Sequence, residues 1–404
     1  MAEASLNQSP RLAGRRMVLP QGTVLKAVVL VILTLLIVLP LVSSVLFTLR
    51  PTNIGAWGDV LVGRLAPNLF WVPLANTVII GFVVASACVL LGGFLAWLVV
   101  MTDVPFRRTI GVMATLPFMI PSFATSLAWG SLFRNDRVGG QTGWLHGLGL
   151  DLPDWLSWGM VPTLTVLTLH YFSLAFTIIA ASLATVNSDL VEAAQIAGAK
   201  GRRILLGIVL PVTTPALVAA GSLCFAGAVS NFAAPALLGL PVRMQTLSTR
   251  LYGMIEVGQV GRGYVIGILL VLVSAFFLWI GNRAISGRRS YATITGKGGR
   301  AKRFELRRSR WPLAAAAFTI LSVSTIVPVI VLIASSLAPS SSALFSDWTL
   351  HYWTGPSDAR IADGTPGIIH NPDIARSVAI TLGLGLAVAL AGMGIGLLAA
   401  FAAA

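Results

Sequence analysis

The feature that most constrains this chain is a series of eight long apolar runs without charges in their cores. A helix needs about 20 apolar residues to cross a hydrocarbon core about 30 Å thick. The runs lie near residues 27–49, 74–101, 109–133, 161–184, 211–229, 264–282, 312–337 and 377–404. The first run is longer than the apolar core of a cleavable signal peptide, so we interpret it as a span. The sequence therefore predicts an all-α, polytopic helical membrane protein with about eight spans.

Composition agrees with this fold class. Hydrophobic residues make up 56% of the chain and charged residues 10%, whereas soluble domains carry about 25% charged residues. Cys88 and Cys224 both fall inside apolar runs. A small buried thiol is ordinary in such a run, so we expect no disulfide framework and no compartment signal from the cysteines.

Basic residues are concentrated in segments that would share one side of the membrane. If the N-terminus is cytoplasmic, the tail and the segments 102–108, 185–210 and 283–311 hold 19 of the 28 lysines and arginines. They also hold 5 of the 14 acids, so the inside sums to +14 and the outside to zero. Cytoplasmic loops carry an excess of Lys and Arg. The pattern predicts a multi-pass protein of the bacterial inner (plasma) membrane with a cytoplasmic N-terminus.

The basic stretch at 285–311 leaves a second interpretation open. Its lysines and arginines fit a cytoplasmic linker that follows the charge rule, and they also fit a patch for anionic lipid or nucleic acid. We favour the linker, because position along the chain explains the charge. We therefore predict contact with membrane lipids and no nucleic-acid partner.

An internal repeat suggests two related halves. A shift of 288 residues aligns Pro40 with Pro328 and Pro51 with Pro339, and a shift of 304 aligns a further set of small residues. Parallel repeats related by an axis normal to the membrane occur in transporters. We predict a cytoplasmic tail (1–26), a first six-span domain (27–284), a basic linker (285–311) and the start of a second, incomplete domain (312–404). We expect a fragment of a longer protein, or else a separate polypeptide that completes the second half.

The loop at 189–211 carries a spaced motif. Its fixed positions are Glu192, Ala193, Ala194, Gly198, Ile208, Leu210 and Pro211. Asp189 is placed to cap a short helix with an acid three positions on. Gly198 would end that helix, because glycine adopts turn conformations that other residues resist. Pro211 would open the fifth span, where a missing amide donor costs little.

This spacing resembles the EAA signature of the permeases of ATP-binding-cassette (ABC) importers. The resemblance implies a type I ABC importer transmembrane domain in which the loop docks into a groove on a separate ATP-hydrolysing subunit, of which the importer holds two copies. It also implies an extracytoplasmic solute-binding protein that delivers the solute. The alternative for the loop is an amphipathic helix that only anchors two spans.

Several kinds of chemistry have no motif in the sequence. The nearest string to a phosphate-binding loop, at 295–299, has Gly298 where Ser or Thr is required. We predict no catalytic residues, no metal site and no cofactor on this chain, which is therefore not an enzyme. Gradient-driven carriers usually hold ionisable residues within the bilayer, and His170 is the one candidate in the predicted spans. A proton relay through His170 is open, but helix packing or an aromatic contact is the simpler role.

Further strings at 231–239, 246–253 and 292–312 resemble the fused permeases of the ferric-iron and 2-aminoethylphosphonate type. The resemblance implies transport of ferric iron or a related small anion or phosphonate. Polar residues near predicted span ends are candidates for the solute pathway, with helix packing as the alternative: Asn76, Ser126, Asn231 and Tyr252. A gradient-driven secondary transporter is the alternative function.

Overall fold

The computed structural model describes the chain outside residues 1–20, 187, 287–303, 339–347, 359–363 and 404. Most of the predicted tail (1–26) and of the basic linker (285–311) lies outside the described residues. The described residues form helices, with one isolated parallel bridge between Thr102 and Phe304. The predicted all-α class is confirmed.

The elements follow one another along the chain as follows. The α-helices of ten residues or more are α1 (Gln21–Leu33), α2 (Leu39–Thr48), α4 (Val72–Met101), α6 (Ser122–Phe133), α9 (Met160–Ala184), α12 (Leu210–Ser230), α13 (Leu247–Glu256), α14 (Val260–Ser286), α15 (Arg310–Leu321), α16 (Val327–Leu337) and α18 (Pro372–Ala403). Shorter α-helices are α3 (Gly55–Leu61), α5 (Arg107–Met113), α7 (Trp144–Gly147), α8 (Asp154–Ser157), α10 (Ser188–Ile196), α11 (Gly201–Ile204) and α17 (His351–Thr354). π-helical turns are η1 (Thr34–Val38), η2 (Pro67–Trp71), η5 (Leu205–Val209), η6 (Pro235–Gly239) and η9 (Ser322–Ile326). The 3₁₀ turns are η3 (Leu116–Met119), η4 (Asp136–Val138), η7 (Leu240–Val242) and η8 (Arg307–Ser309).

Seven helical stretches among the described residues are long and apolar enough to cross a membrane. They run over Lys26–Thr48, Pro67–Met101, Asp154–Ala184, Gly201–Ser230, Val260–Arg283, Arg307–Leu337 and Pro372–Ala400. Each contains one of the predicted runs to within a few residues. The eighth run is different, because its two parts, Arg107–Met119 and Ser122–Phe133, are bent by 93°.

The break in this eighth run has a local cause. Pro121 follows Ile120, and a residue before proline is pushed out of the α conformation by the proline ring. Ile120 accordingly has φ −84° and ψ 121°. The expectation of one uninterrupted span at 109–133 is corrected: the stretch is a broken span or a re-entrant loop.

Four long helices accommodate a proline in the same way. Pro40, Pro73, Pro211 and Pro328 are each the second residue of an α-helix that directly follows a π-helical turn. Proline lacks the amide donor and its ring clashes with the carbonyl four residues earlier, so the preceding turn widens. The turns η1 and η9 are 288 residues apart, as are the prolines that follow them; the duplicated plan stays a prediction.

Two compact units make up the chain, residues 1–44 with 372–404 and residues 45–371. In the larger unit, α4, α9 and α12 pack against one another and form the main core. An added Cβ on Gly92 would lie 2.6 Å from the backbone nitrogen of Phe176, so α4 and α9 approach at a position only glycine fits. Cys88 and Cys224 are free and buried in this core, as the sequence predicts.

A second core joins α3, α13 and α14 around Val60, Leu247 and Ile266. The hydroxyl of Thr77 on α4 accepts a hydrogen bond from the amide of Leu247 at 2.9 Å and donates to the carbonyl of Pro73 at 2.7 Å. Thr77 therefore fixes the start of α13 on α4.

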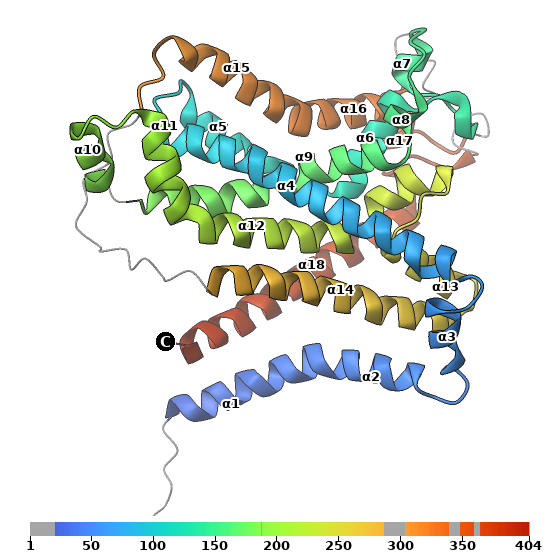
Figure 1. Cartoon of the computed structure of the whole chain (residues 1–404). Helices are drawn as coiled ribbons and strands as arrows, with labels where there is room; N and C mark the ends of the chain where they lie inside the picture. The colour runs from blue at the N-terminus through green and yellow to red at the C-terminus, as the bar shows by residue number, and fades with distance from the viewer. Residues whose placement is uncertain (1–20, 187, 287–303, 339–347, 359–363, 404) are drawn as a thin grey trace, which may run out of the picture. The chain divides into compact units, whose positions relative to one another are not determined.

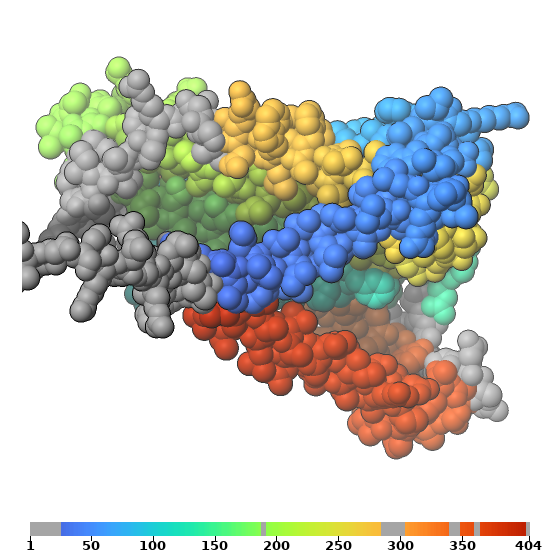
Figure 2. Space-filling view, turned by 90° about the horizontal axis from the view of Figure 1, so that it is seen from below, coloured from blue at the N-terminus to red at the C-terminus, as the bar shows by residue number. Residues whose placement is uncertain are grey.

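In the smaller unit, α1 and α18 contact each other. Apolar side chains of α18 are exposed along its length, including Leu382 (69%) and Leu397 (64%), and Figure 2 shows the surface of this helix in red. Exposed apolar side chains on a helix of 32 residues are what a lipid-facing segment presents.

Candidate functional site

The predicted motif loop forms a short helix with a defined end. Helix α10 stops where Gly198 takes a left-handed conformation with φ +80°. The amide of Gly198 donates to the carbonyl of Gln195, and the amide of Ala199 donates to that of Ala194, each at 2.9 Å. These two bonds define a Schellman motif. The sequence-based prediction that Gly198 ends the helix is confirmed. The predicted cap by Asp189 involves a side chain that the structure does not describe.

Helix α10 presents one face to the protein and the other outward. Val191 is 1% exposed, whereas Glu192 and Ala193 are exposed and Ile196 is 88% exposed. Figure 1 shows α10 at the end of the larger unit next to α11, and in Figure 2 it stands out in light green. An exposed carboxylate beside an uncovered apolar side chain is suited to contact with another protein.

A single long helix connects this loop to the core. Helices α11 and α12 run on through the π-helical turn η5 without interruption, so Ile208 lies in the widened turn and Leu210 begins α12. Pro211 does not open the span, because the helix begins ten residues earlier at Gly201; this prediction is wrong. The missing donor of Pro211 is accommodated by the widened turn instead.

Basic side chains surround the junction between α10 and α11. A shallow concavity is lined by Gly198, Lys200, Arg202, Arg203, Leu206 and Gly207. Lys200, Arg202 and Arg203 are exposed. The junction therefore joins positive charge to the acidic and apolar face of α10.

The segment 304–306, at the end of the predicted linker, is fastened to the same end of the unit. The amide of Phe304 donates to the carbonyl of Met101 at 2.9 Å, and the amide of Leu306 donates to the carboxylate of Asp103 at 2.8 Å. The Phe304 ring lies against Gly201, 3.7 Å from where a Cβ would be. The entry to the predicted second half thus contacts the start of the helix that follows the motif loop.

The four pathway candidates lie in different surroundings. Asn76 donates to the carbonyl of Gln245 at 2.8 Å, and buried Ser126 donates to the carbonyl of Ser122 at 2.7 Å. Tyr252 is 48% exposed, with its ring 4.9 Å from that of Phe232. The structure does not bring Asn76, Ser126 and Tyr252 together by direct hydrogen bonds.

Asn231 is the centre of a polar cluster that sequence reasoning missed. Its Nδ2 donates to Ser122 Oγ at 2.9 Å and to the Tyr171 hydroxyl at 3.3 Å, and Ser248 Oγ donates to its carbonyl at 2.9 Å. The cluster joins the start of α6, the middle of α9, the end of α12 and α13. The signal available in the sequence was Pro121, which predicts a break directly before Ser122.

His170 lies beside this cluster, among aromatic rings. It is 8% exposed, its ring stacks on Phe118 with centroids 5.3 Å apart, and the Tyr171 ring is 4.6 Å away. The expected aromatic contact is confirmed, and the proton relay remains an untested prediction.

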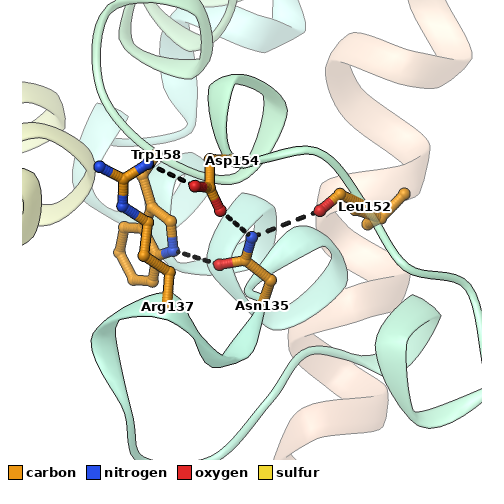
Figure 3. Close-up of polar contacts among 5 residues, drawn as sticks. All are labelled: Asn135, Arg137, Leu152, Asp154 and Trp158. Atoms are coloured by element: carbon orange, nitrogen blue, oxygen red, sulfur yellow. Dashed lines mark hydrogen bonds and ion pairs between the residues drawn. The ribbon is translucent and has the colours of Figure 1, made fainter.

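A group of polar contacts orders the loops at the other end of the larger unit (Figure 3). Asn135 Nδ2 donates to Asp154 Oδ1 at 2.7 Å and to the Leu152 carbonyl at 3.3 Å, and its Oδ1 accepts from Trp158 Nε1 at 2.9 Å. Arg137 pairs with the second oxygen of Asp154. A buried amide thus ties α6 to α8 and fixes the ring of Trp158.

Together these features define a polytopic α-helical membrane protein whose motif loop leads through the Gly198 turn into a spanning helix. Residues 88–291, just over half of the chain, match the family described as binding-protein-dependent transport system inner membrane component. The chain belongs to this family, which confirms the resemblance inferred from the motif.

Curated relatives are named for different solutes. The chain is 28% identical over 158 residues to the 2-aminoethylphosphonate transport system permease protein PhnU of Salmonella typhi, a match covering 37% of this chain and 52% of that protein. It is 21% identical over 210 residues to the sulfate transport system permease protein cysT of Chlorokybus atmophyticus, covering 50% and 71%. The ABC transporter permease protein y4fN of Sinorhizobium fredii is 28% identical over 291 residues, covering 66% and 48%. The chain spans about half the length of the phosphonate relatives it matches.

A solved structure shares the fold. A chain of a bacterial ABC transporter involved in the import of alginate, an acidic polysaccharide, aligns with a TM-score of 0.50 at 15% identity, over 64% of this chain and 93% of that one. The fold is that of an ABC importer transmembrane domain.

Proposed function

We propose that this chain is the permease subunit of an ABC importer and forms the pathway for a small solute delivered by an extracytoplasmic binding protein. The observation that carries the proposal is the motif helix α10, with Glu192 and Ile196 exposed and Gly198 in a left-handed turn. Family membership supports it. ATP hydrolysis is then the work of two separate subunits, one of which docks on α10.

The proposed coupling is mechanical. A subunit that grips α10 moves the end of an uninterrupted helix from Gly201 to Ser230, and that helix packs against α4 and α9. Nucleotide state and solute access are linked only if each ligand contacts the two conformations differently. The loop supplies the contacts on the nucleotide side, with its position in the cytoplasm supported by the charge asymmetry.

We further propose that the solute is a small oxyanion, of which phosphonates and sulfate are examples. The names of the phosphonate and sulfate relatives support this class. Ferric iron, the other expectation from the sequence, has no support in these names and stays an untested prediction.

The test is assembly and transport with the ATPase and binding protein that accompany this permease. Glu192→Lys should lower ATPase co-purification and solute uptake at least tenfold while the thermal unfolding temperature is unchanged, because the side chain is exposed. Glu256→Lys, at an exposed site at the other end of the larger unit, is the matched control for co-purification. Equal co-purification of both variants would contradict the proposal. Uptake by vesicles holding this chain alone under an ion gradient would favour a secondary transporter.

A further inference from the structure

A cavity of about 360 Å³ lies at the end of the larger unit away from α10. Ligand sites in proteins commonly begin at about 300 Å³. Its walls come from α6, the loops between residues 134 and 158, η6, α16 with the adjoining Ala338, and α17. They are lined by Ser126, Leu127, Gly130, Ser131, Arg134, Gln141, Thr142, Trp144, Trp158, Leu237, Leu238, Ser335, Ala338 and Tyr352. The cavity therefore lies where helices of the two predicted halves meet.

The lining has one sign of charge. Arg134 is the charged residue among the described residues that form the walls, and the other polar groups are hydroxyls, an amide and indole rings. Guanidinium and hydroxyl donors are the groups that proteins use to bind oxyanions, and arginine matches the planar spacing of two such oxygens. A cationic solute would meet uncompensated positive charge in this cavity.

Arg134 is held in place but keeps donor capacity. Its Nη2 donates to the Gly139 carbonyl at 2.8 Å, and its guanidinium carbon lies 5.6 Å from the centre of the Trp158 ring. Its Nε is buried and has no hydrogen-bond partner. Ser335 Oγ, which lines the same cavity from α16, is also buried without a partner. Buried donors without partners are unfavourable, so both groups gain from a ligand that accepts hydrogen bonds.

The polar residues in Figure 3 hold the ring on which Arg134 stacks. Asn135 and Asp154 fix the indole of Trp158, the ring over which Arg134 lies. Because Trp158 is held by a hydrogen bond within a buried site, Arg134 has a fixed surface to stack on. A preorganised cation loses less side-chain freedom when it binds an anion.

We propose that this cavity is an oxyanion-binding site in which Arg134 is the cationic ligand and Ser335 a hydroxyl donor from the second half. This inference rests on the proposed function, since the bound oxyanion would be the solute on its way through the permease. An anion between Arg134 and Ser335 contacts both α6 and α16, two helices that pack together. The affinity for the anion would therefore depend on the relative position of α6 and α16.

The experiment measures equilibrium binding of radiolabelled sulfate, phosphate and 2-aminoethylphosphonate to the full chain in phosphatidylcholine nanodiscs. The wild type should bind at least one of them saturably, and Arg134→Gln should weaken that binding about 10- to 100-fold, the range expected for a hydrogen-bonded charge. Arg64→Gln is the matched control, because Arg64 is an exposed arginine that does not line the cavity. It should bind within about twofold of wild type.

A second variant guards against misfolding of the first. Ser335→Ala removes one uncharged donor from a different helix and should weaken binding about three- to tenfold. No saturable binding by the wild type, equal losses in Arg134→Gln and Arg64→Gln, or unchanged binding in both cavity variants would overturn the oxyanion site. If ATP-driven uptake still depended on Glu192 in that case, the importer proposal would stand without the site.

Discussion

Replacing Gly198 tests whether the backbone turn, rather than the side-chain surface, transmits force from α10. The residue has φ +80°, and no atom lies within 4 Å of where a Cβ would be. A substitution therefore meets no neighbour, and its effect comes from the left-handed backbone alone. That conformation costs an L-residue roughly 1–2 kcal/mol, which is roughly a 5- to 30-fold change in the population of the capped helix.

The size of the loss should follow the conformational preference of the new residue. Asparagine enters the left-handed region more readily than other residues, so Gly198→Asn should retain most of the activity. Gly198→Ala should lose several-fold, and Gly198→Val, which is β-branched, should lose the most. The assay is binding-protein-stimulated ATP hydrolysis by the assembled importer in proteoliposomes, with the unfolding temperature of the chain measured in parallel.

Three results would refute this reasoning. Equal impairment by Asn and Val would show that any side chain at position 198 obstructs docking, so that the backbone conformation is not the cause. Full activity of the Val variant would show that the turn has no role in coupling. If the variants with the largest loss of activity also had the lowest unfolding temperatures, Gly198 would be assigned to folding instead.

Two further predictions concern the core of the larger unit. Thr77→Val should lower the free energy of unfolding by about 1–3 kcal/mol, because the buried amide of Leu247 loses its acceptor. The control is Thr165→Val, whose hydroxyl bonds only within its own helix and which should change that free energy by less than about 0.5 kcal/mol. Denaturant titration in detergent measures both. Gly92→Ala should destabilise by about 1–3 kcal/mol, because its Cβ would overlap the backbone of α9. Gly93→Ala, whose Cβ would lie 3.7 Å from the nearest atom, should be neutral or slightly stabilising in a thermal unfolding scan.

The spans and the motif turn were predictable because each depends on local sequence. A long apolar run needs only to be counted, and the glycine that ends α10 adopts a conformation that other residues resist. The 93° bend after Ile120 was not anticipated because hydropathy records that a stretch is apolar but not which way it runs. The effect of Pro121 on the residue before it was the overlooked local signal.

The polar cluster could not be derived from spacing. Asn231 was singled out, but its partners Ser122 and Tyr171 are 109 and 60 residues away in the chain, and only the packing of α6, α9 and α12 brings them together. Pro211 was misplaced for a related reason. A proline near the edge of an apolar run looks like a helix start, and only the backbone reveals that the preceding turn has widened to keep the helix continuous.

The four prolines that follow widened turns have a mechanical consequence. At each of them the helix lacks one of the hydrogen bonds that resist bending, while its ends remain joined in one rod. A load applied at one end would then flex the rod at Pro40, Pro73 or Pro328, or between Pro211 and the further proline Pro215 inside α12, before it distorts the segments on either side. In such a bundle the positions of the prolines determine where a helix bends, and the helical segments between them can tilt as rigid units.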